Sequence, residues 1–255
     1  MQGSCLCGDV VFLVTPPLRD AVACHCTQCR KVSGHFWAAA SVPMTGFRLI
    51  RADGLAWYRS SPAATRGFCR TCGATLFWKP DGEDRMSFSP GALDGPTGLT
   101  VAEHIFTGDA GDDYAPAGPP PVPSPAPPVL QASCLCGGVR FSVPRPGGGI
   151  TACHCTQCRK LSGHYSASFD VPEAEVSFQA RQPLAEFATP GGGRRGFCTA
   201  CGSSLYFRAR DAAFSVEAGV VDGPTGSSLA GHIFVADKGD YYSLTDGLTQ
   251  HPGWD

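Results

Sequence analysis

Charged residues are scarce in this sequence, and neither sign dominates. Asp, Glu, Lys and Arg together make up 16% of the residues and leave a formal net charge of -2 at pH 7. A protein that binds nucleic acid needs a basic patch or stripe to meet the phosphates. We therefore expect no nucleic-acid partner.

Long apolar runs are also missing. No window approaches the roughly 18 apolar residues of a membrane-spanning helix. The opening MQGSCLCGDV has neither the basic start nor the apolar core of a secretion signal. These features predict a cytoplasmic protein with no membrane partner.

Helical periodicity is absent as well, because no convincing run of about ten residues repeats its apolar side chains every 3.6 positions. The apolar letters instead form short runs broken by Gly, Pro and Asp, which is typical of strands. These runs are VVFLV (10–14), HFWAAASV (35–42), ATLFW (74–78), VRFSV (139–143), HYSASFDV (164–171) and SSLYF (203–207). We predict a mainly β fold, in which CTQCRK (26–31) forms one helical turn.

Cysteine, in contrast, is abundant, and its arrangement repeats. The seven cysteines of the first half recur 129 positions later, and the motifs DGPTG and HIF recur 128 positions later. The period is the size of a domain, so the chain is a tandem duplication. We predict two zinc-binding β domains, at 1–114 (the first copy) and 131–255 (the second copy).

The segment between the copies, at 115–130, is rich in proline. It contains eight prolines from Pro116 to Pro128, a composition that favours an extended, semi-rigid polyproline II spacer. The alternative interpretation is a proline-rich ligand for a recognition domain.

Two cysteine pairs in each copy have the form of metal knuckles, SCLCG followed by GFCRTCG or GFCTACG. In a reducing compartment clustered thiols are metal ligands more often than disulfides, although unliganded buried cysteines are an alternative. Two pairs supply the four thiolates of a structural zinc. We assign one zinc to Cys5, Cys7, Cys69 and Cys72, and its twin to Cys134, Cys136, Cys198 and Cys201.

Three cysteines remain in each copy, within the repeated stretch ACHCTQCRK: Cys24, Cys26 and Cys29, then Cys153, Cys155 and Cys158. Three protein ligands with a free fourth position are typical of a catalytic zinc, where water or a substrate thiol completes the coordination. Alternatively, His25, His35 or His104 completes an inert site, or the cysteines form a metal-free redox sensor.

The motifs GSCLCGDV, CHCTQCRKVSG, RGFCRTCGATLF and HIF resemble those of the glutathione-dependent formaldehyde-activating enzyme family, also called the centromere protein V type. The resemblance covers about residues 2–114 and 131–246. It implies a mainly β fold with two zinc ions per domain, four per chain. The implied activity is that of a carbon-sulfur lyase, which joins glutathione and formaldehyde as S-(hydroxymethyl)glutathione.

The resemblance also implies that the three-cysteine groups hold the catalytic zinc, and that the partners are a small thiol and an aldehyde. Glutathione carries two carboxylates and one ammonium, so we expect cationic residues near the metal to bind it. The candidates are Arg30, Lys31, Arg66, Arg159, Lys160 and Arg195. Asp94 and Asp222 either bind the ammonium or stabilise turns.

Two other functions fit the same residues. In the first, all the metals are structural and the duplicated chain is a two-site interaction module that works through bivalency. The second is a thiol or methionine-sulfoxide redox enzyme. Its weakness is that every cysteine already has a metal role, which leaves no nucleophile with a resolving partner.

Overall fold

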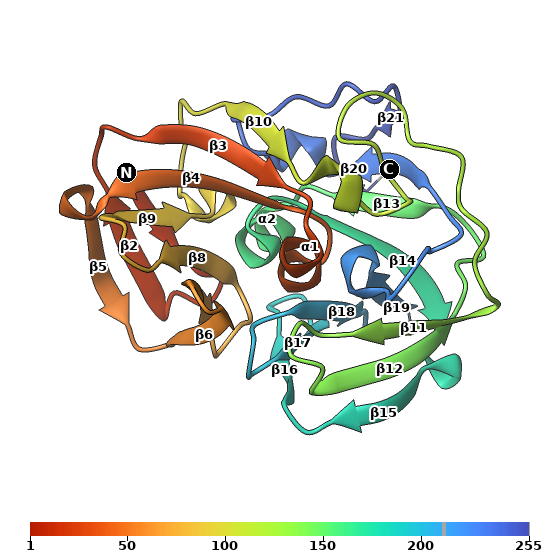
Figure 1. The fold of residues 1–255 in the computed structure, drawn as a ribbon. Helices are drawn as coiled ribbons and strands as arrows, with labels where there is room; N and C mark the ends of the chain where they lie inside the picture. The colour runs from red at the N-terminus through yellow and green to blue at the C-terminus, as the bar shows by residue number, and fades with distance from the viewer. Residues whose placement is uncertain (211–212, 255) are drawn as a thin grey trace.

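A computed structural model describes residues 1–210 and 213–254 (Figure 1). The first copy contains two sheets. Strands β1 (Gln2–Ser4), β2 (Val10–Val14) and β5 (Phe47–Ala52) form a three-stranded antiparallel sheet. The larger sheet has the order β10-β3-β4-β9-β8-β7-β6. Its strands are β3 (Arg19–Cys24), β4 (Trp37–Pro43), β6 (Leu55–Ser61), β7 (Ala64–Cys69), β8 (Thr75–Pro80), β9 (Arg85–Phe88) and β10 (Val101–Ile105).

The second copy repeats this plan. Its small sheet consists of β11 (Val129–Ser133), β12 (Val139–Pro144) and β15 (Ser177–Arg181). The large sheet has the order β16-β17-β18-β19-β14-β13-β20-β21. Its strands are β13 (Ile150–Cys153), β14 (Ser166–Pro172), β16 (Leu184–Ala188), β17 (Arg194–Cys198), β18 (Ser204–Arg208), β19 (Ala213–Glu217), β20 (Leu229–Ile233) and β21 (Thr249–Gln250). The mainly β fold and the duplication are confirmed, and the six apolar runs contribute to β2, β4, β8, β12, β14 and β18.

Helices are few and short. The predicted helical turn is α1 (Thr27–Ser33) in the first copy and α2 (Thr156–Ser162) in the second, and the two lie side by side at the centre of the molecule (Figure 1). The single-turn 3-10 helices are η1 (Met44–Gly46), η2 (Pro90–Ala92), η3 (Thr107–Asp109), η4 (Glu173–Glu175), η5 (Ala218–Val220) and η6 (Val235–Asp237). None of the helices in the described part of the chain has the length and apolar character needed to cross a bilayer.

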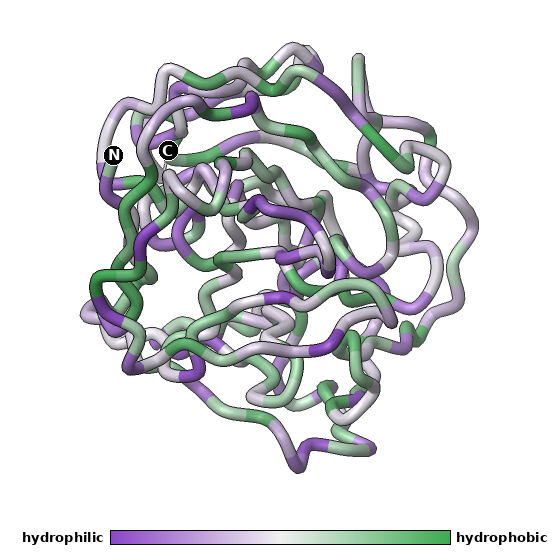
Figure 2. The backbone as a smooth tube through the Cα atoms, turned by 60° about the vertical axis from the view of Figure 1, so that its left-hand side comes forward, coloured by the Kyte–Doolittle hydropathy of each residue, from purple (hydrophilic) through white to green (hydrophobic). Residues whose placement is uncertain are grey.

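Each copy contributes to the hydrophobic core of the other. The core around Phe12 and Phe77 of the first copy also contains Leu161 and Tyr241 of the second, whereas Phe36 belongs to the core of the second copy. Along the backbone, hydrophobic segments are short and alternate with hydrophilic ones (Figure 2). Burial of one such large side chain contributes roughly 2 kcal/mol to stability. The two copies are therefore stabilised as one unit.

The central contact between the copies depends on glycine. The Gly91 N–H in η2 donates to the Gly163 carbonyl at 3.1 Å, and the Gly219 N–H in η5 donates to the Gly34 carbonyl at 2.7 Å. A Cβ on Gly91 would lie 2.6 Å from that carbonyl oxygen, closer than any side chain tolerates. The repeated contact shows that the copies pack as a pseudo-symmetric pair.

The segments after β10 and after β20 cross to the opposite copy. Asp112 accepts a hydrogen bond from the Thr225 backbone N–H at 2.8 Å, and Asp240 accepts one from the Thr97 backbone N–H at 2.7 Å. The linker follows the second copy, where Ser228 Oγ donates to the Pro121 carbonyl at 2.8 Å. The spacer interpretation is corrected to this extent: the copies touch directly, and the linker does not hold them apart.

Candidate metal centres and an adjoining cleft

The knuckle cysteines of the first copy meet at one point between the sheets. The sulfurs of Cys5, Cys7, Cys69 and Cys72 all lie within 4.8 Å of one another, with Cys5 and Cys7 3.5 Å apart and Cys7 and Cys69 3.6 Å apart. A tetrahedral zinc with bonds of about 2.3 Å would hold sulfurs about 3.8 Å apart. The Val10 N–H also donates to Cys5 Sγ, at 3.3 Å. The donor set fits zinc.

The second copy repeats this group with Cys134, Cys136, Cys198 and Cys201. Cys134 and Cys136 are 3.4 Å apart, and the Val139 N–H donates to Cys134 Sγ at 3.2 Å. The structure thus brings together both predicted pairs of knuckles.

The glycine after each second knuckle contacts the opposite copy. Gly73 has a φ of +77°, and a Cβ there would lie 2.6 Å from the Phe197 ring; Gly202, also at φ +77°, has the same relation to Phe68. Glycine supplies the left-handed turn and also the space for the neighbouring ring. Each four-cysteine group therefore supports the contact between the copies.

The three-cysteine group of the first copy lies where β3 joins α1. Cys24 ends the strand, Cys26 is the residue before the helix, and Cys29 lies within the helix. Their sulfurs lie within 4.8 Å of one another, and the Cys24 and Cys26 sulfurs are 3.6 Å apart. Cys153, Cys155 and Cys158 form the matching group where β13 joins α2.

No histidine joins these groups in the described ranges 1–210 and 213–254. His25 Nδ1 lies 2.7 Å from the Tyr114 hydroxyl, and its Nε2 lies 2.9 Å from His104 Nδ1. His35 Nδ1 lies 3.6 Å from an Asp113 carboxylate oxygen. The three histidines that were candidates for a fourth ligand are thus turned to other partners. Each three-cysteine group therefore offers three protein ligands. The sequence analysis did not predict the contact between His25 and Tyr114, because nothing in the cysteine motif points to Tyr114.

An arginine contacts each three-cysteine group. Arg66 Nη2, from β7, donates to Cys29 Sγ at 3.3 Å, and Arg195 Nη2, from β17, donates to Cys158 Sγ at 3.4 Å. Hydrogen bonds from Cys24 and Cys29 lower the pKa of Cys26 to about 2, and the positive charge of Arg66 acts in the same direction. Two of the six predicted cations, Arg66 and Arg195, therefore lie beside the three-cysteine groups.

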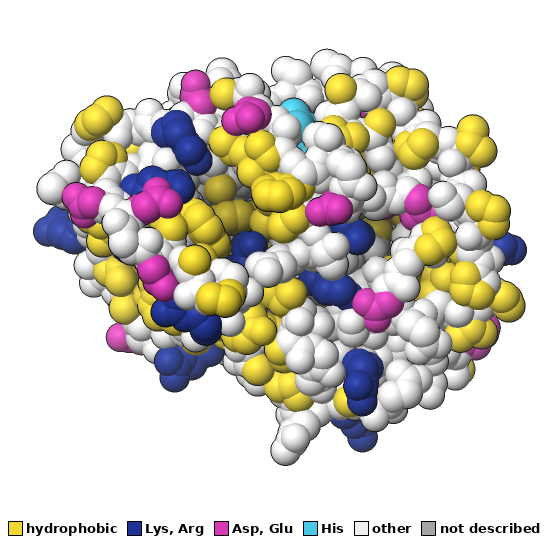
Figure 3. Space-filling view, viewed as in Figure 1, with side chains coloured by type: hydrophobic (Ala, Val, Ile, Leu, Met, Phe, Trp, Pro, Cys, Tyr) yellow, Lys and Arg dark blue, Asp and Glu magenta, His cyan; other side chains and the backbone are white. Residues whose placement is uncertain are grey.

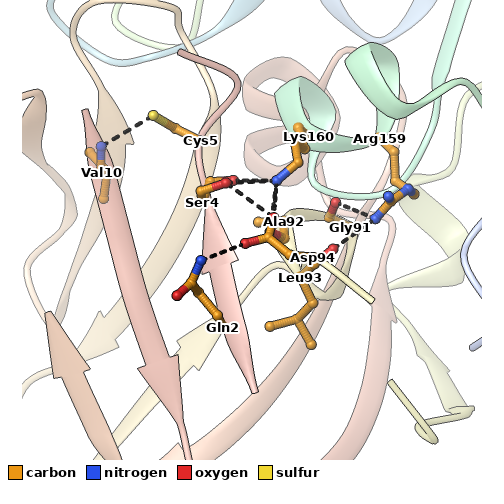
Figure 4. A network of polar contacts seen from close by, with 10 residues as sticks. All are labelled: Gln2, Ser4, Cys5, Val10, Gly91, Ala92, Leu93, Asp94, Arg159 and Lys160. Carbon is orange, nitrogen blue, oxygen red and sulfur yellow. Dashed lines mark hydrogen bonds and ion pairs between the residues drawn. The ribbon is translucent and has the colours of Figure 1, made fainter. Parts of the chain in front are cut away.

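The two predicted lysines lie elsewhere, in the interface between the copies. Lys160 Nζ donates to the Ser4 carbonyl and hydroxyl, at 3.2 and 2.8 Å, and forms an ion pair with Asp94 (Figure 4). Lys31 forms the equivalent pair with Asp222. The two lysines were expected beside the three-cysteine groups, and this expectation is corrected. Asp94 and Asp222 each bind an ammonium, but the ammonium belongs to a lysine of the opposite copy.

Arg159, which precedes Lys160, also points into the interface. Arg159 Nη1 donates to the carbonyls of Gly91 and Leu93, at 2.8 and 3.2 Å (Figure 4). The charge of Arg30 acts on Asp113, whose pKa is nevertheless raised to about 7 because the carboxyl is buried. Neither arginine is among the residues that line the cleft described next.

A cleft of about 690 Å³ adjoins the three cysteines of the first copy, which line it. Its apolar walls include Trp37, Trp78 and Ile105, and Figure 3 shows a hollow lined by apolar side chains over β4 and β8. Three cationic and two acidic residues share the lining: Arg19, Arg66, Arg85, Glu103 and Asp109. The cleft therefore offers an apolar surface together with charges of both signs.

The phenylalanine of the HIF motif has unusual backbone geometry in both copies. Phe106 has a φ of +54° and Phe234 a φ of +56°, and these are the only non-glycine residues with positive φ in the described part of the chain. A bulky residue in the left-handed region is strained, and such strain concentrates at functional sites. Phe106 also lines the cleft, with 61% of its surface exposed.

Comparisons with known proteins give similarities to a protein family, to a curated protein and to solved structures. A family model described as glutathione-dependent formaldehyde-activating enzyme matches residues 1–109 and 129–237, one segment in each copy. An uncharacterized lyase of Schizosaccharomyces pombe is 22% identical over 121 residues, which cover 47% of this chain and 88% of that protein. A crystal structure of a Rhodobacter sphaeroides protein is 28% identical, with a TM-score of 0.35, and the alignment covers 41% of this chain and 100% of that one.

Proposed function

Since this chain belongs to the glutathione-dependent formaldehyde-activating enzyme family, we propose that it is a zinc-dependent carbon-sulfur lyase. Its substrates are glutathione or a similar small thiol and an aldehyde such as formaldehyde. The lyase description of the yeast relative supports this class of reaction. The thiol requirement further suggests a reducing compartment, such as the cytoplasm.

The observation that carries the proposal is a metal-competent group of three cysteines that opens onto a cleft. Four cysteines would close a tetrahedral site, whereas three leave one position for a ligand from outside. Zinc held by Cys24, Cys26 and Cys29 would lower the pKa of a thiol bound to it and so supply a thiolate at neutral pH.

The reaction itself forms one bond and moves one proton. The sulfur of the thiol attacks the aldehyde carbon, the carbonyl π electrons move to oxygen, and the proton of the thiol ends on that oxygen. The product is a hydroxymethyl thioether, and the reverse reaction cleaves the same carbon-sulfur bond. No oxidant or reductant is consumed.

The residues of the cleft match the charges of a peptide thiol. Arg66 lies beside Cys29, with Arg19 and Arg85 in the same lining, so a ligand carboxylate has cationic partners. Glu103 and Asp109 offer carboxylates to an ammonium. In this arrangement the protein positions the thiol, and the aldehyde needs little space of its own.

The test is the rate of exchange between formaldehyde and its glutathione adduct, followed by NMR on zinc-loaded protein against a protein-free control. The control is essential because the adduct also forms unaided. We expect acceleration by the native chain and its loss when Cys26 and Cys155 are both changed to serine. No acceleration with glutathione or any of several other small thiols would reject the lyase assignment.

A further inference from the structure

The two three-cysteine groups have the same sequence but different surroundings. Trp37 pairs with Cys24 across β3 and β4, and Ser166 holds the same register position opposite Cys153. In the first copy the Trp37 indole N–H donates to Ser89 Oγ at 2.8 Å. In the second, Ser166 Oγ donates to the carboxylate of Glu217, at 2.7 Å to one oxygen. The position that Ser89 holds in the first copy is therefore held by a buried acid, Glu217, in the second.

In the first copy, the cation beside the cysteines has unused hydrogen-bonding capacity. Arg66 is 6% exposed, lines the cleft, and lies over the Trp37 ring at 5.6 Å. Its Nε and Nη1 have no hydrogen-bond partner within the described ranges. A buried guanidinium without an acceptor is costly, so this geometry favours an anionic ligand in the cleft.

In the second copy, the corresponding cation, Arg195, also has an Nε without a hydrogen-bond partner, but the buried carboxylate of Glu217 lies near enough to act on its charge, without forming an ion pair among the described residues. Glu217 is 2% exposed, and the opposite charges of Glu217 and Arg195 act on each other. Burial raises the pKa of Glu217 to about 7, so the carboxylate is ionised above neutral pH. A ligand carboxylate brought to Arg195 would then add a second negative charge in a buried environment, which is unfavourable.

Two further differences separate the copies. Glu103 pairs with Val22, whereas glycine holds the equivalent position in β20, where Gly231 pairs with Thr151. The C-terminal segment also covers part of the second copy: the Phe234 N–H donates to the Gly253 carbonyl at 2.9 Å, and its ring lies 6.1 Å from that of Trp254. The acidic partner for an ammonium is thus lost, and the phenylalanine of HIF is packed against the chain's own tail.

We propose that the two three-cysteine sites are specialised, so that the site of the first copy alone binds the carboxylate-bearing thiol. Arg66 is the specificity-determining residue, and Glu217 excludes the same ligand from the second copy. This inference rests on the proposed function, because it assigns the substrate of that function to one of two metal sites.

The test is isothermal titration of the full-length, zinc-loaded chain with S-benzylglutathione at pH 8, where Glu217 is ionised. This probe keeps both carboxylates and the ammonium but has no free thiol, so its binding does not depend on thiolate coordination. We expect one equivalent per chain. The intrinsic fluorescence of Trp37 and Trp78 should change on binding, because both line the cleft.

Matched variants identify the copy that binds. Arg66→Gln should raise the Kd of the single equivalent by at least about tenfold, since a charge-assisted hydrogen bond is lost, whereas Arg195→Gln should leave it unchanged. The isosteric Glu217→Gln should add a second, weaker equivalent, because the glycine at position 231 and the C-terminal segment remain in place. Circular dichroism and zinc content verify that each variant is folded and loaded.

The outcomes separate this inference from the function on which it rests. The specialisation would be overturned if the native chain bound two equivalents of the probe with equal affinity. It would also be overturned if Arg195→Gln lost the single equivalent, or if Glu217→Gln gained no second one. Absence of any binding would overturn it as well. In all four cases the NMR exchange rate decides independently whether the lyase assignment survives.

Discussion

Lys31 and Lys160 illustrate at the residue scale why closeness in sequence misleads. Each lies two positions after the last cysteine of its group, yet two residues of a helix point to nearly opposite sides of its axis. Cys29 therefore faces the metal group while Lys31 reaches Asp222 of the second copy. Arg66 is remote in sequence, but its side chain reaches Cys29 from β7.

Loss of the Lys160 ammonium should destabilise the whole chain. The Lys160→Ala variant removes the ammonium that Asp94 and the Ser4 carbonyl share, and leaves Asp94 only its hydrogen bonds from the side chains of Gln2 and Ser4. We expect the free energy of unfolding to fall by about 2 kcal/mol, as measured by urea denaturation. The matched control is Arg59→Ala, which removes an ion pair whose side chains are 55% and 51% exposed. It should cost less than about 1 kcal/mol, and an equal loss in both variants would contradict this account of the interface.

Glu217 should give stability a pH dependence of its own. Because burial raises its pKa in the folded chain from 4.5 to about 7, the folded state binds the proton more tightly than the unfolded state. The stabilisation is complete below pH 4.5 and is lost as the pH rises through 7. Between pH 5 and 8 the native chain should lose about 2.5 kcal/mol more than Glu217→Gln, measured by urea unfolding of both. Parallel pH curves would contradict the assignment.

At the element scale, the sequence predicts strands well and their assembly poorly. Apolar runs such as VVFLV become strands because they alternate between buried and half-buried positions, and the burial of Val10, Phe12 and Val14 follows this pattern. The order of the strands depends on contacts between distant segments, which local patterns do not record. The cysteine spacing did indicate which turns meet, because cysteines that bind one ion must lie close together.

Much of the candidate site was beyond sequence analysis for the same reason. The cysteine groups could be recognised from spacing alone, whereas the walls of the cleft come from β4, β8 and the end of β10. Trp37 reads as an ordinary apolar residue of its strand. Glu217 looks like a solvent-exposed residue until the packing shows it to be buried.

The docking of η2 on α2 supplies a test at this scale. Gly91→Ala would place a methyl group 2.6 Å from two carbonyl oxygens, those of Arg159 and Gly163. We expect a loss of about 2 kcal/mol or more, because backbone on both sides must shift. Gly95→Ala is the control, since nothing lies within 4 Å of its Cβ position. Equal melting temperatures for the two variants would contradict the close approach described above.

At the scale of the whole molecule, duplication has produced one interlocked unit with two kinds of cysteine group. The four-cysteine groups lie against the opposite copy through Gly73 and Gly202, so they hold the pair together. The three-cysteine groups offer one ligand fewer than a closed tetrahedral zinc site requires. Two chemically distinct sites in one chain are what a duplicated domain allows, because one copy can keep the original ligand while the other changes.

The zinc content of the purified chain tests the central claim most directly. Elemental analysis of protein prepared without chelator should give close to four zinc ions per chain, and the variant with both Cys26→Ser and Cys155→Ser should retain two. The variant should keep its native circular dichroism, because the four-cysteine groups are intact. Only two ions in the native chain, or four in the variant, would contradict a metal held by three cysteines in each copy.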